Sequence, residues 1–295
     1  MNNTLFKGVA TALITPLNEK GIDYNKLEKL INWQIDEGIN ALVIAGTTGE
    51  ASTLTDAEHK DLIKESVKMV AGRVPVIAGT GSNDTDYALD LTKYSEKVGA
   101  DGFLVVTPYY NKATQNGLYK MFTQIADSVE KPVILYNVPS RTGVNIAPST
   151  CQRLAEHKNI CAIKEASGNI SQIAEVAHLV GDEMDIYSGN DDQIVPIMSL
   201  GGKGVISVLS NVLPKETVEI CDSFFKGDVK KSCELQLNFL PLINALFSEV
   251  NPIPVKSAMA KMGWCENFLR LPLTPMEEKN EIILHKLMKE NGINI

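Results

Sequence analysis

Short runs of apolar and β-branched residues recur along the first two thirds of the chain, and helix-period segments lie between most of them. Successive runs start roughly 30 residues apart, which is the length that a strand–helix–strand unit needs. Their apolar character is continuous, as expected for strands buried on both faces of a parallel sheet. The eight predicted strands are residues 9–14, 41–45, 74–78, 102–106, 132–136, 160–164, 185–188 and 204–208.

The intervening segments carry helix signals. Residues 24–37 place Leu27, Leu30 and Ile31 on one stripe. Thr55 and Glu58 read as a capping box that opens a helix. Residues 170–180 and 193–200 also follow a helical period. Eight strands with helices between them favour a (β/α)8 TIM barrel of the α/β class. Two separate Rossmann halves remain as the alternative.

The pattern changes after about residue 212, because no further strand run occurs. Residues 214–226, 228–247, 252–262 and 275–290 all read as helices. Thr274, Pro275 and Glu277 resemble the start of the last one, with an N-cap, a proline at the first position and an acid at the third. We therefore expect a catalytic barrel over residues 1–225 and a C-terminal helical domain over residues 226–295.

Composition narrows the function classes. The 295-residue chain has a formal net charge of −8, and no dense Lys/Arg stripe appears, which argues against a nucleic-acid partner. No run of 18 apolar residues is present, so no transmembrane helix is expected. Residues 1–7 carry no secretory signal pattern. The five cysteines are scattered without a CxxC pair, which indicates a reduced, cytoplasmic compartment.

Lys164 ends a short apolar run, and lysine is among the least buried residue types. One reason for a lysine there is chemical, because an amine that attacks a ketone must be unprotonated and apolar surroundings disfavour an ammonium. Such an amine can form an imine with a ketone substrate. The alternative is a lysine that leaves its strand for solvent or pairs with Glu165.

Other polar side chains follow neighbouring predicted strands, at the barrel end where reactive groups usually lie. Thr47 and Thr48, in a Gly-flanked turn, suit a carboxylate. Tyr136 and Tyr110 suit proton relay through a threonine hydroxyl. Arg141 can grip a second carboxylate in its bidentate fork. Each alone is typical of an ordinary turn, rim or loop, whereas their common placement favours an active site.

Other chemistries lack their motifs. The four histidines lie in predicted helices or helix ends, and neither HExxH nor a His pair follows a strand, so no metal site is expected. No GxSxG serine elbow exists. Residues 79–84 resemble GxGxxG without the third glycine, which is a weak dinucleotide signal.

Over essentially its whole length the chain resembles the pyruvate-dependent class I lyases of the N-acetylneuraminate lyase superfamily. The order and spacing of the matching motifs agree as well. The motifs occupy residues 11–16, 46–50, 74–81, 107–111, 136–143, 163–168, 201–207 and 251–254.

Within that superfamily the chain is most similar to the branch that joins pyruvate to L-aspartate 4-semialdehyde, giving 4-hydroxy-tetrahydrodipicolinate. Members that cleave sialic acid resemble it at Lys164 and Tyr136 but lack a counterpart of Arg141. An arginine suits an acceptor that bears its own carboxylate. Two alternatives stay open: a sister Schiff-base aldolase for sialic acid, keto-deoxy-sugars or hydroxy-oxoglutarate, and a non-catalytic binding barrel.

The resemblance also implies roles for individual residues. Lys164 would carry the pyruvate imine, with no metal and no organic cofactor. Thr48 would hold the pyruvate carboxylate, and Tyr136, Thr47 and Tyr110 would relay protons. The remaining expected pocket positions are Ile206 and Gly189. The residue matching Tyr110 reaches the neighbouring subunit's site, so the resemblance implies a homotetramer built as a dimer of tight dimers.

Some members are inhibited by lysine at the dimer interface. The matching positions that would form this candidate allosteric site are Ala51, Ser52, Asp56, His59, Asn83, Tyr87 and Tyr109. In lysine-sensitive bacterial members, the position of Asp56 is typically His and that of Tyr87 is typically Glu. Loss of that Glu removes a partner for the lysine ammonium. We therefore expect lysine inhibition to be weak or absent.

Overall fold

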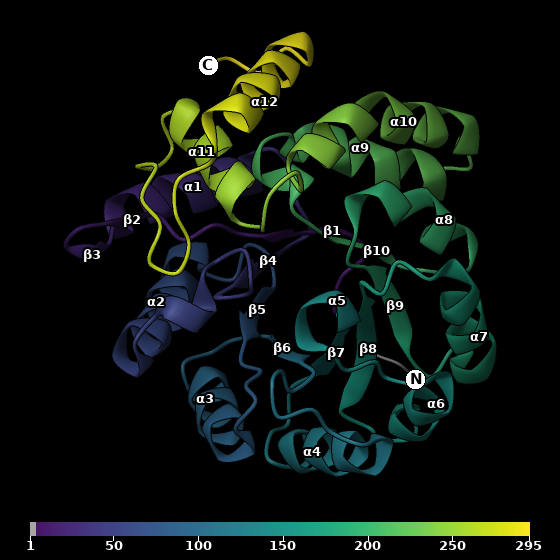
Figure 1. Cartoon of the computed structure of the whole chain (residues 1–295). Helices are drawn as coiled ribbons and strands as arrows, with labels where there is room; N and C mark the ends of the chain where they lie inside the picture. The colour runs from purple at the N-terminus through teal and green to yellow at the C-terminus, as the bar shows by residue number, and fades with distance from the viewer. Residues whose placement is uncertain (1–3) are drawn as a thin grey trace.

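The computed structural model describes residues 4–295, and its central feature is a closed barrel of eight parallel strands (Figure 1). Every barrel strand pairs in parallel with two neighbours. The strands are arranged around the barrel in their order along the chain, and the last strand pairs with the first to close it. This confirms the predicted (β/α)8 barrel and excludes two Rossmann halves. The barrel strands are β1 (Gly8–Ala12), β4 (Ala41–Ile44), β5 (Val76–Gly79), β6 (Gly102–Val106), β7 (Val133–Asn137), β8 (Ile160–Glu165), β9 (Asp185–Ser188) and β10 (Gly204–Ser207).

Helices surround the barrel and bury one face each against the strands (Figure 1). In α4, for example, Leu118, Met121, Phe122 and Ile125 recur at helical spacing and are all buried. The surrounding helices are α1 (Tyr24–Asp36), α2 (Asp56–Val70), α3 (Thr85–Lys97), α4 (Gln115–Asp127), α6 (Pro148–Ala155), α7 (Ile170–Val180), α8 (Ile194–Ser199) and α9 (Pro214–Phe225).

A second apolar cluster fills the inside of the barrel. Phe6 stacks on Tyr187 with ring centroids 4.2 Å apart, and the Tyr187 hydroxyl donates to the Phe6 carbonyl. Ala162 belongs to the same inner cluster. Because alternate residues of a strand face the same side, Lys164 follows Ala162 on the inner face of β8, nearer the carboxyl end. The apolar cluster thus fills the inside of the barrel, and Lys164 lies at the carboxyl end, where TIM barrels carry their active sites.

Three further helices form the C-terminal part. They are α10 (Val229–Ala245), α11 (Ile253–Lys261) and α12 (Glu278–Glu290). Helix α10 packs against both α9 and α12, and α11 packs against α12. Trp264, after α11, stacks on Trp33 of α1 at 4.6 Å. The chain between α10 and α12 therefore lies on the barrel beside α1 and α2 (Figure 1).

One predicted helix start is wrong. Helix α12 begins at Glu278, with Glu277 as its N-cap residue, and not at the Thr274–Pro275 signal. Glu249 accepts the backbone N–H of Glu277 at 3.0 Å, and Met276 is buried in the core. These tertiary contacts hold the segment extended and override the local capping pattern. The small elements β2 (Leu17–Asn18), β3 (Gly21–Ile22) and α5 (Pro139–Thr142) were not predicted.

Candidate active site

Lys164 and Tyr136 lie side by side at the carboxyl ends of neighbouring strands. Lys164 is on β8, Tyr136 is on β7, and the two are direct partners in the parallel register. The Lys164 Nζ atom lies 4.3 Å from the centroid of the Tyr136 ring. The two residues are only 6% and 7% exposed. A lysine amine and a tyrosine ring are therefore adjacent in a sheltered place.

Neither alternative for Lys164 is found. Its burial shows that it does not leave the strand for solvent. Glu165, the next residue, has other partners, because its two carboxylate oxygens each lie 3.1 Å from Asn137 Nδ2 and Oε1 accepts the Ser167 N–H at 2.9 Å. Burial raises the pKa of Glu165, and these hydrogen bonds oppose the shift. The Glu165 carboxyl thus connects the ends of β7 and β8 through Asn137.

Gly189 gives Lys164 the space that it occupies. A Cβ atom at Gly189 would lie 2.7 Å from Ala166 Cβ, closer than real Cβ atoms come, and 3.1 Å from Lys164 Cε, so that the lysine side chain would have to move by a few tenths of an ångström. Ile206 is fully buried on β10 and belongs to the apolar cluster inside the barrel. Gly189 thus lies directly against Lys164, and Ile206 contributes to the packed barrel interior.

The turn after β4 carries Thr47 and Thr48. Backbone N–H groups of Gly49 and Ala51 donate to the Gly46 carbonyl at 3.1 and 3.3 Å, which closes the turn. Thr48 is 3% exposed, and its Oγ1 atom accepts a hydrogen bond from Asn251 Nδ2 at 3.0 Å. The turn is therefore held both by its own backbone and by the C-terminal part of the chain.

Asn251 also contacts Arg141. The exposed Arg141, in α5, donates from Nη2 to the Asn251 carbonyl at 3.3 Å. Asn251 thus joins the two groups that we expect to bind carboxylates, Thr48 and Arg141. Residues 251–254 belong to one of the family motifs, but the sequence predicts no role for Asn251, because nothing local links it to a turn some 200 residues earlier. The long-range contact appears only in the fold.

A cavity of about 470 Å³ brings some of the expected residues together, whereas Lys164, Thr48, Gly189 and Ile206 are not among the residues that line it. Thr47, Tyr136 and Arg141 line it. So do five of the seven residues expected at the candidate lysine site, namely Ala51, Ser52, His59, Tyr87 and Tyr109. The other two, Asp56 and Asn83, are not among the lining residues, and the Asn83 carbonyl accepts from Asn111 Nδ2 at 2.9 Å.

Tyr110 does not line this cavity. It follows β6, has a positive φ of 69°, and is 92% exposed. Tyr109 beside it is 37% exposed and faces the cavity. A phenol this exposed contributes nothing to the packing of its own chain, so it is free to meet another molecule.

Asp191 is a buried carboxyl close to the site. Its Oδ2 atom accepts the backbone N–H groups of Val208 and Leu209 at 3.0 and 2.9 Å. Burial raises the pKa of Asp191, while hydrogen bonds and the charge of Lys164 act in the opposite direction. Asp191 therefore fixes the chain after β10 and adds a carboxyl to the electrostatic surroundings of Lys164.

His59 is not a candidate acid or base. Its Nε2 atom lies 2.8 Å from the Gly79 carbonyl, and the residue is 4% exposed. Burial lowers its pKa, so the neutral ring donates to that carbonyl. Within residues 4–295, no cluster of His, Cys, Asp or Glu side chains is arranged to hold a metal ion. No helix in the same range combines the length and apolarity needed to cross a bilayer.

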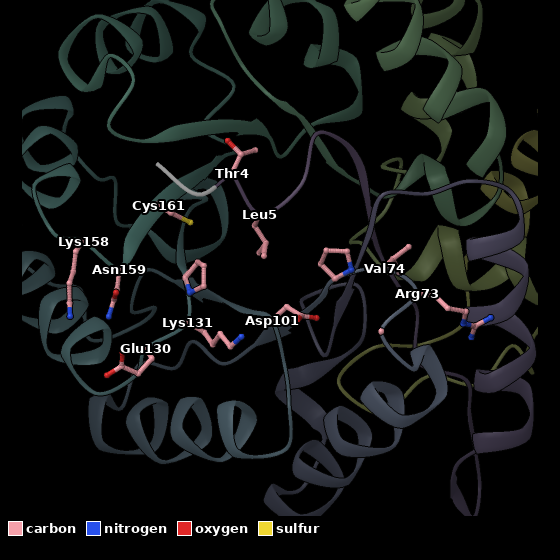
Figure 2. Close-up of a pocket in the computed structure, with 13 residues that line it drawn as sticks. Thr4, Leu5, Arg73, Val74, Asp101, Glu130, Lys131, Lys158, Asn159 and Cys161 are labelled. Atoms are coloured by element: carbon pink, nitrogen blue, oxygen red, sulfur yellow. The ribbon is translucent and has the colours of Figure 1, made fainter. Parts of the chain in front are cut away.

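A larger hollow, of about 650 Å³, lies at the opposite end of the barrel (Figure 2). Its polar side chains serve the framework. Asp101 accepts the Val76 N–H at 2.9 Å, and Asn159 Nδ2 donates to the carbonyls of Ala126 and Val129. In TIM barrels this end is concerned with stability rather than catalysis. We assign the chemistry to the cavity at the carboxyl ends of the strands.

Known proteins match the chain from end to end. The sequence model of the Dihydrodipicolinate synthetase family matches residues 5–291. The 4-hydroxy-tetrahydrodipicolinate synthase of Clostridium perfringens strain 13 is 55% identical over 289 residues, which is 98% of this chain and 99% of the relative.

Solved structures of the same family also match the chain over nearly its whole length. The chloride-inhibited dihydrodipicolinate synthase from Acinetobacter baumannii, complexed with pyruvate, is 44% identical with a TM-score of 0.96, covering 99% of this chain and 100% of the other. A structure described as a monomeric dihydrodipicolinate synthase variant is 45% identical with a TM-score of 0.96, covering 98% of each chain. With a lysine and a tyrosine paired at the carboxyl end of a TIM barrel, this chain belongs to the dihydrodipicolinate synthetase family of class I aldolase-type lyases.

Proposed function

We propose that this chain condenses pyruvate with L-aspartate 4-semialdehyde through an imine on Lys164, giving 4-hydroxy-tetrahydrodipicolinate for the biosynthesis of lysine and diaminopimelate. The observation that carries the proposal is the buried Lys164 amine lying 4.3 Å from the centre of the Tyr136 ring. The family runs this reaction without an organic cofactor or metal, since the imine itself activates pyruvate.

The reaction passes through an imine and then an enamine on Lys164. The Lys164 amine adds to the keto carbon of pyruvate, and loss of water gives the imine. Loss of a methyl proton gives the enamine, whose carbon attacks the aldehyde of the semialdehyde. The amine of the bound adduct then adds to the imine carbon, closes the ring and releases Lys164. Tyr136 supplies and accepts protons in these steps, and Thr47 and Tyr110 complete the relay.

Two groups receive the two carboxylates. Thr48, with the backbone N–H groups of its turn, holds the carboxylate of pyruvate. Arg141 reaches the rim of the cavity and takes the carboxylate of the semialdehyde. Gly189 and Ile206 shape the wall behind Lys164. A sugar acceptor would have no use for Arg141, and this favours the semialdehyde over the sister aldolase substrates.

The exposure of Tyr110 supports an assembly in which each site is completed by a neighbour. We propose a homotetramer built as a dimer of tight dimers, with Tyr110 entering the site of the partner subunit. One of the solved structures, 45% identical to this chain, is described as a monomeric variant. We also propose a cytoplasmic location, because the five cysteines are scattered along the sequence without a CxxC pair.

The proposal is tested by a coupled assay. Pyruvate and aspartate semialdehyde are supplied together, and NADPH consumption is followed through added dihydrodipicolinate reductase. A parallel reaction offers pyruvate and N-acetylmannosamine and is read by sialic acid formation. We expect turnover with pyruvate and the semialdehyde and none with pyruvate and N-acetylmannosamine. The Arg141→Ala variant should raise the KM for the semialdehyde about tenfold or more. Turnover with only the sugar would contradict the acceptor assignment.

A further inference from the structure

The C-terminal part of the chain reaches the active-site turn through a fully buried ion pair. Lys256, on α11, places its Nζ atom 2.6 Å from Glu50 Oε1, and both side chains are 0% exposed. Glu50 closes the turn that carries Thr47 and Thr48, since its N–H donates to the Thr47 carbonyl at 3.1 Å. A charge on the C-terminal helices is thus in direct contact with this turn.

The pair is the centre of a wider set of hydrogen bonds. Lys256 Nζ also donates to the Thr15 carbonyl at 2.6 Å, and the Thr15 hydroxyl donates to the Gly49 carbonyl at 2.7 Å. The second carboxylate oxygen of Glu50, Oε2, accepts the backbone N–H of Arg270 at 3.3 Å. The last two residues of the turn, Gly49 and Glu50, are therefore both held by hydrogen bonds from residues outside the turn.

The backbone conformation at Glu50 is unusual for a residue that has a side chain. Glu50 has a φ of 57°, a left-handed conformation that favours glycine. A glycine there would relieve the backbone but would have no carboxylate for Lys256. A buried ion pair must also overcome the loss of hydration of both charges, so it is weak grounds for stability alone. Both facts point to a role in placing the turn.

We propose that Lys256 and Glu50 are positioning residues, which set the Thr47–Thr48 turn so that it can receive the carboxylate of pyruvate. The inference rests on the proposed function and extends it, because it makes the C-terminal domain of residues 226–295 part of the pyruvate site. Lys256 touches no substrate. Its ammonium acts through Glu50, and Asn251 supports the same turn from the side of Thr48.

The test compares Glu50→Gln/Lys256→Met, which removes both charges together, with the milder Glu50→Asp, which keeps the charge on a shorter side chain. The double variant leaves no unpaired buried charge, so its melting temperature should stay near that of the unmodified protein. We expect the KM for pyruvate to rise about tenfold or more in both variants, while kcat falls less than about threefold. Trapping of pyruvate by borohydride, followed by intact mass, should need correspondingly more pyruvate.

The matched control is Glu219→Gln/Lys231→Met, which removes an exposed ion pair between α9 and α10 and should change neither value. An unchanged KM for pyruvate in Glu50→Asp and in the folded double variant would overturn the inference and leave the pair as packing. If the double variant does not fold, Glu50→Asp alone decides. An unmodified protein that traps no pyruvate would instead refute the proposed function itself.

Discussion

At the residue scale, the site depends on one lysine held among close neighbours. Lys164 has Tyr136 beside it and Gly189 against its Cε atom, and each of these contacts follows from the alignment of adjacent strands. Lys164 and Tyr136 are predictable from the sequence because both end apolar runs. Roles for Asn251 and Lys256 are not, since their partners Thr48 and Glu50 lie about 200 residues away and no local pattern encodes such a contact.

Gly189→Ala tests the space around Lys164. The added methyl would press on Lys164 Cε and on Ala166 Cβ, so the lysine side chain must shift to make room. We expect kcat to fall about tenfold or more, since small displacements of reacting groups are costly in rate. Steady-state kinetics with pyruvate and the semialdehyde provide the measurement. The double variant Gly189→Ala/Ala166→Gly should recover only part of kcat, and wild-type rates in Gly189→Ala would show that the close approach is not needed.

Residues near the candidate lysine site predict weak feedback. Asp56, which stands where sensitive relatives typically have His, forms an ion pair with Lys60 at 3.0 Å. Burial, together with Asp56, raises the pKa of Tyr87, so the phenol stays neutral and offers no charge to a lysine ammonium. We expect full activity in the presence of submillimolar L-lysine. Tyr87→Glu should increase sensitivity, and clear inhibition of the unmodified enzyme would refute this reading.

At the element scale, the chain's own signals predict most of the structure. All eight strands appear where continuous apolar runs stand, and the Thr55–Glu58 capping box starts α2 as expected. The predicted start of α12 is wrong, because the hydrogen bond from Glu277 to Glu249 and the burial of Met276 hold the predicted first turn extended. Helix α5 was not predicted because it is a single turn of four residues, too short to show a period.

The contact between α2 and the segment after α11 predicts a pH effect. Arg270 donates to both carboxylate oxygens of Glu58, at 2.7 and 2.5 Å, and the Arg270 hydrogen bonds lower the pKa of Glu58 from 4.5 to about 2. A carboxyl with a lowered pKa stabilises the fold fully above its unfolded value, and that stability is lost as the pH falls toward about 2. After solvent screening we expect the contribution to be about 1 kcal/mol.

Glu58→Gln checks this expectation. Urea unfolding at several pH values between neutrality and about 3 should show the variant less stable at neutral pH, with the difference shrinking as the pH falls. Glu234→Gln, which changes an exposed glutamate on α10, is the matched control and should follow the unmodified protein. A difference that stays constant across the pH range would mean that the Glu58–Arg270 pair is not its source.

At the scale of the whole molecule, a single chain leaves its site without Tyr110. The exposed phenol stands away from its own cavity, although the proposed relay needs it. Sequence reasoning reached this arrangement only through the family resemblance, because exposure at one position is not encoded in a local pattern. The C-terminal helices were likewise expected as an extension, but their contacts with the active-site turn came from the structure.

Subunit complementation tests the shared site. Lys164→Ala and Tyr110→Phe chains should each have little activity when prepared alone. If Tyr110 enters the partner's site, mixed assemblies contain Tyr110→Phe chains that keep Lys164 and receive an intact Tyr110 from their Lys164→Ala partner. We expect coexpressed chains, purified through two different tags, to be far more active than the two variants added together. Activity equal to that sum would place Tyr110 outside the neighbouring site.

The most direct test of the account is to identify the residue that binds pyruvate. The protein is incubated with pyruvate and borohydride, and the modified residue is found by intact mass and peptide mapping. We expect a single reduced pyruvate adduct on Lys164 and no adduct in Lys164→Ala. An adduct on a different lysine, or none at all, would contradict the central claim that Lys164 carries the chemistry.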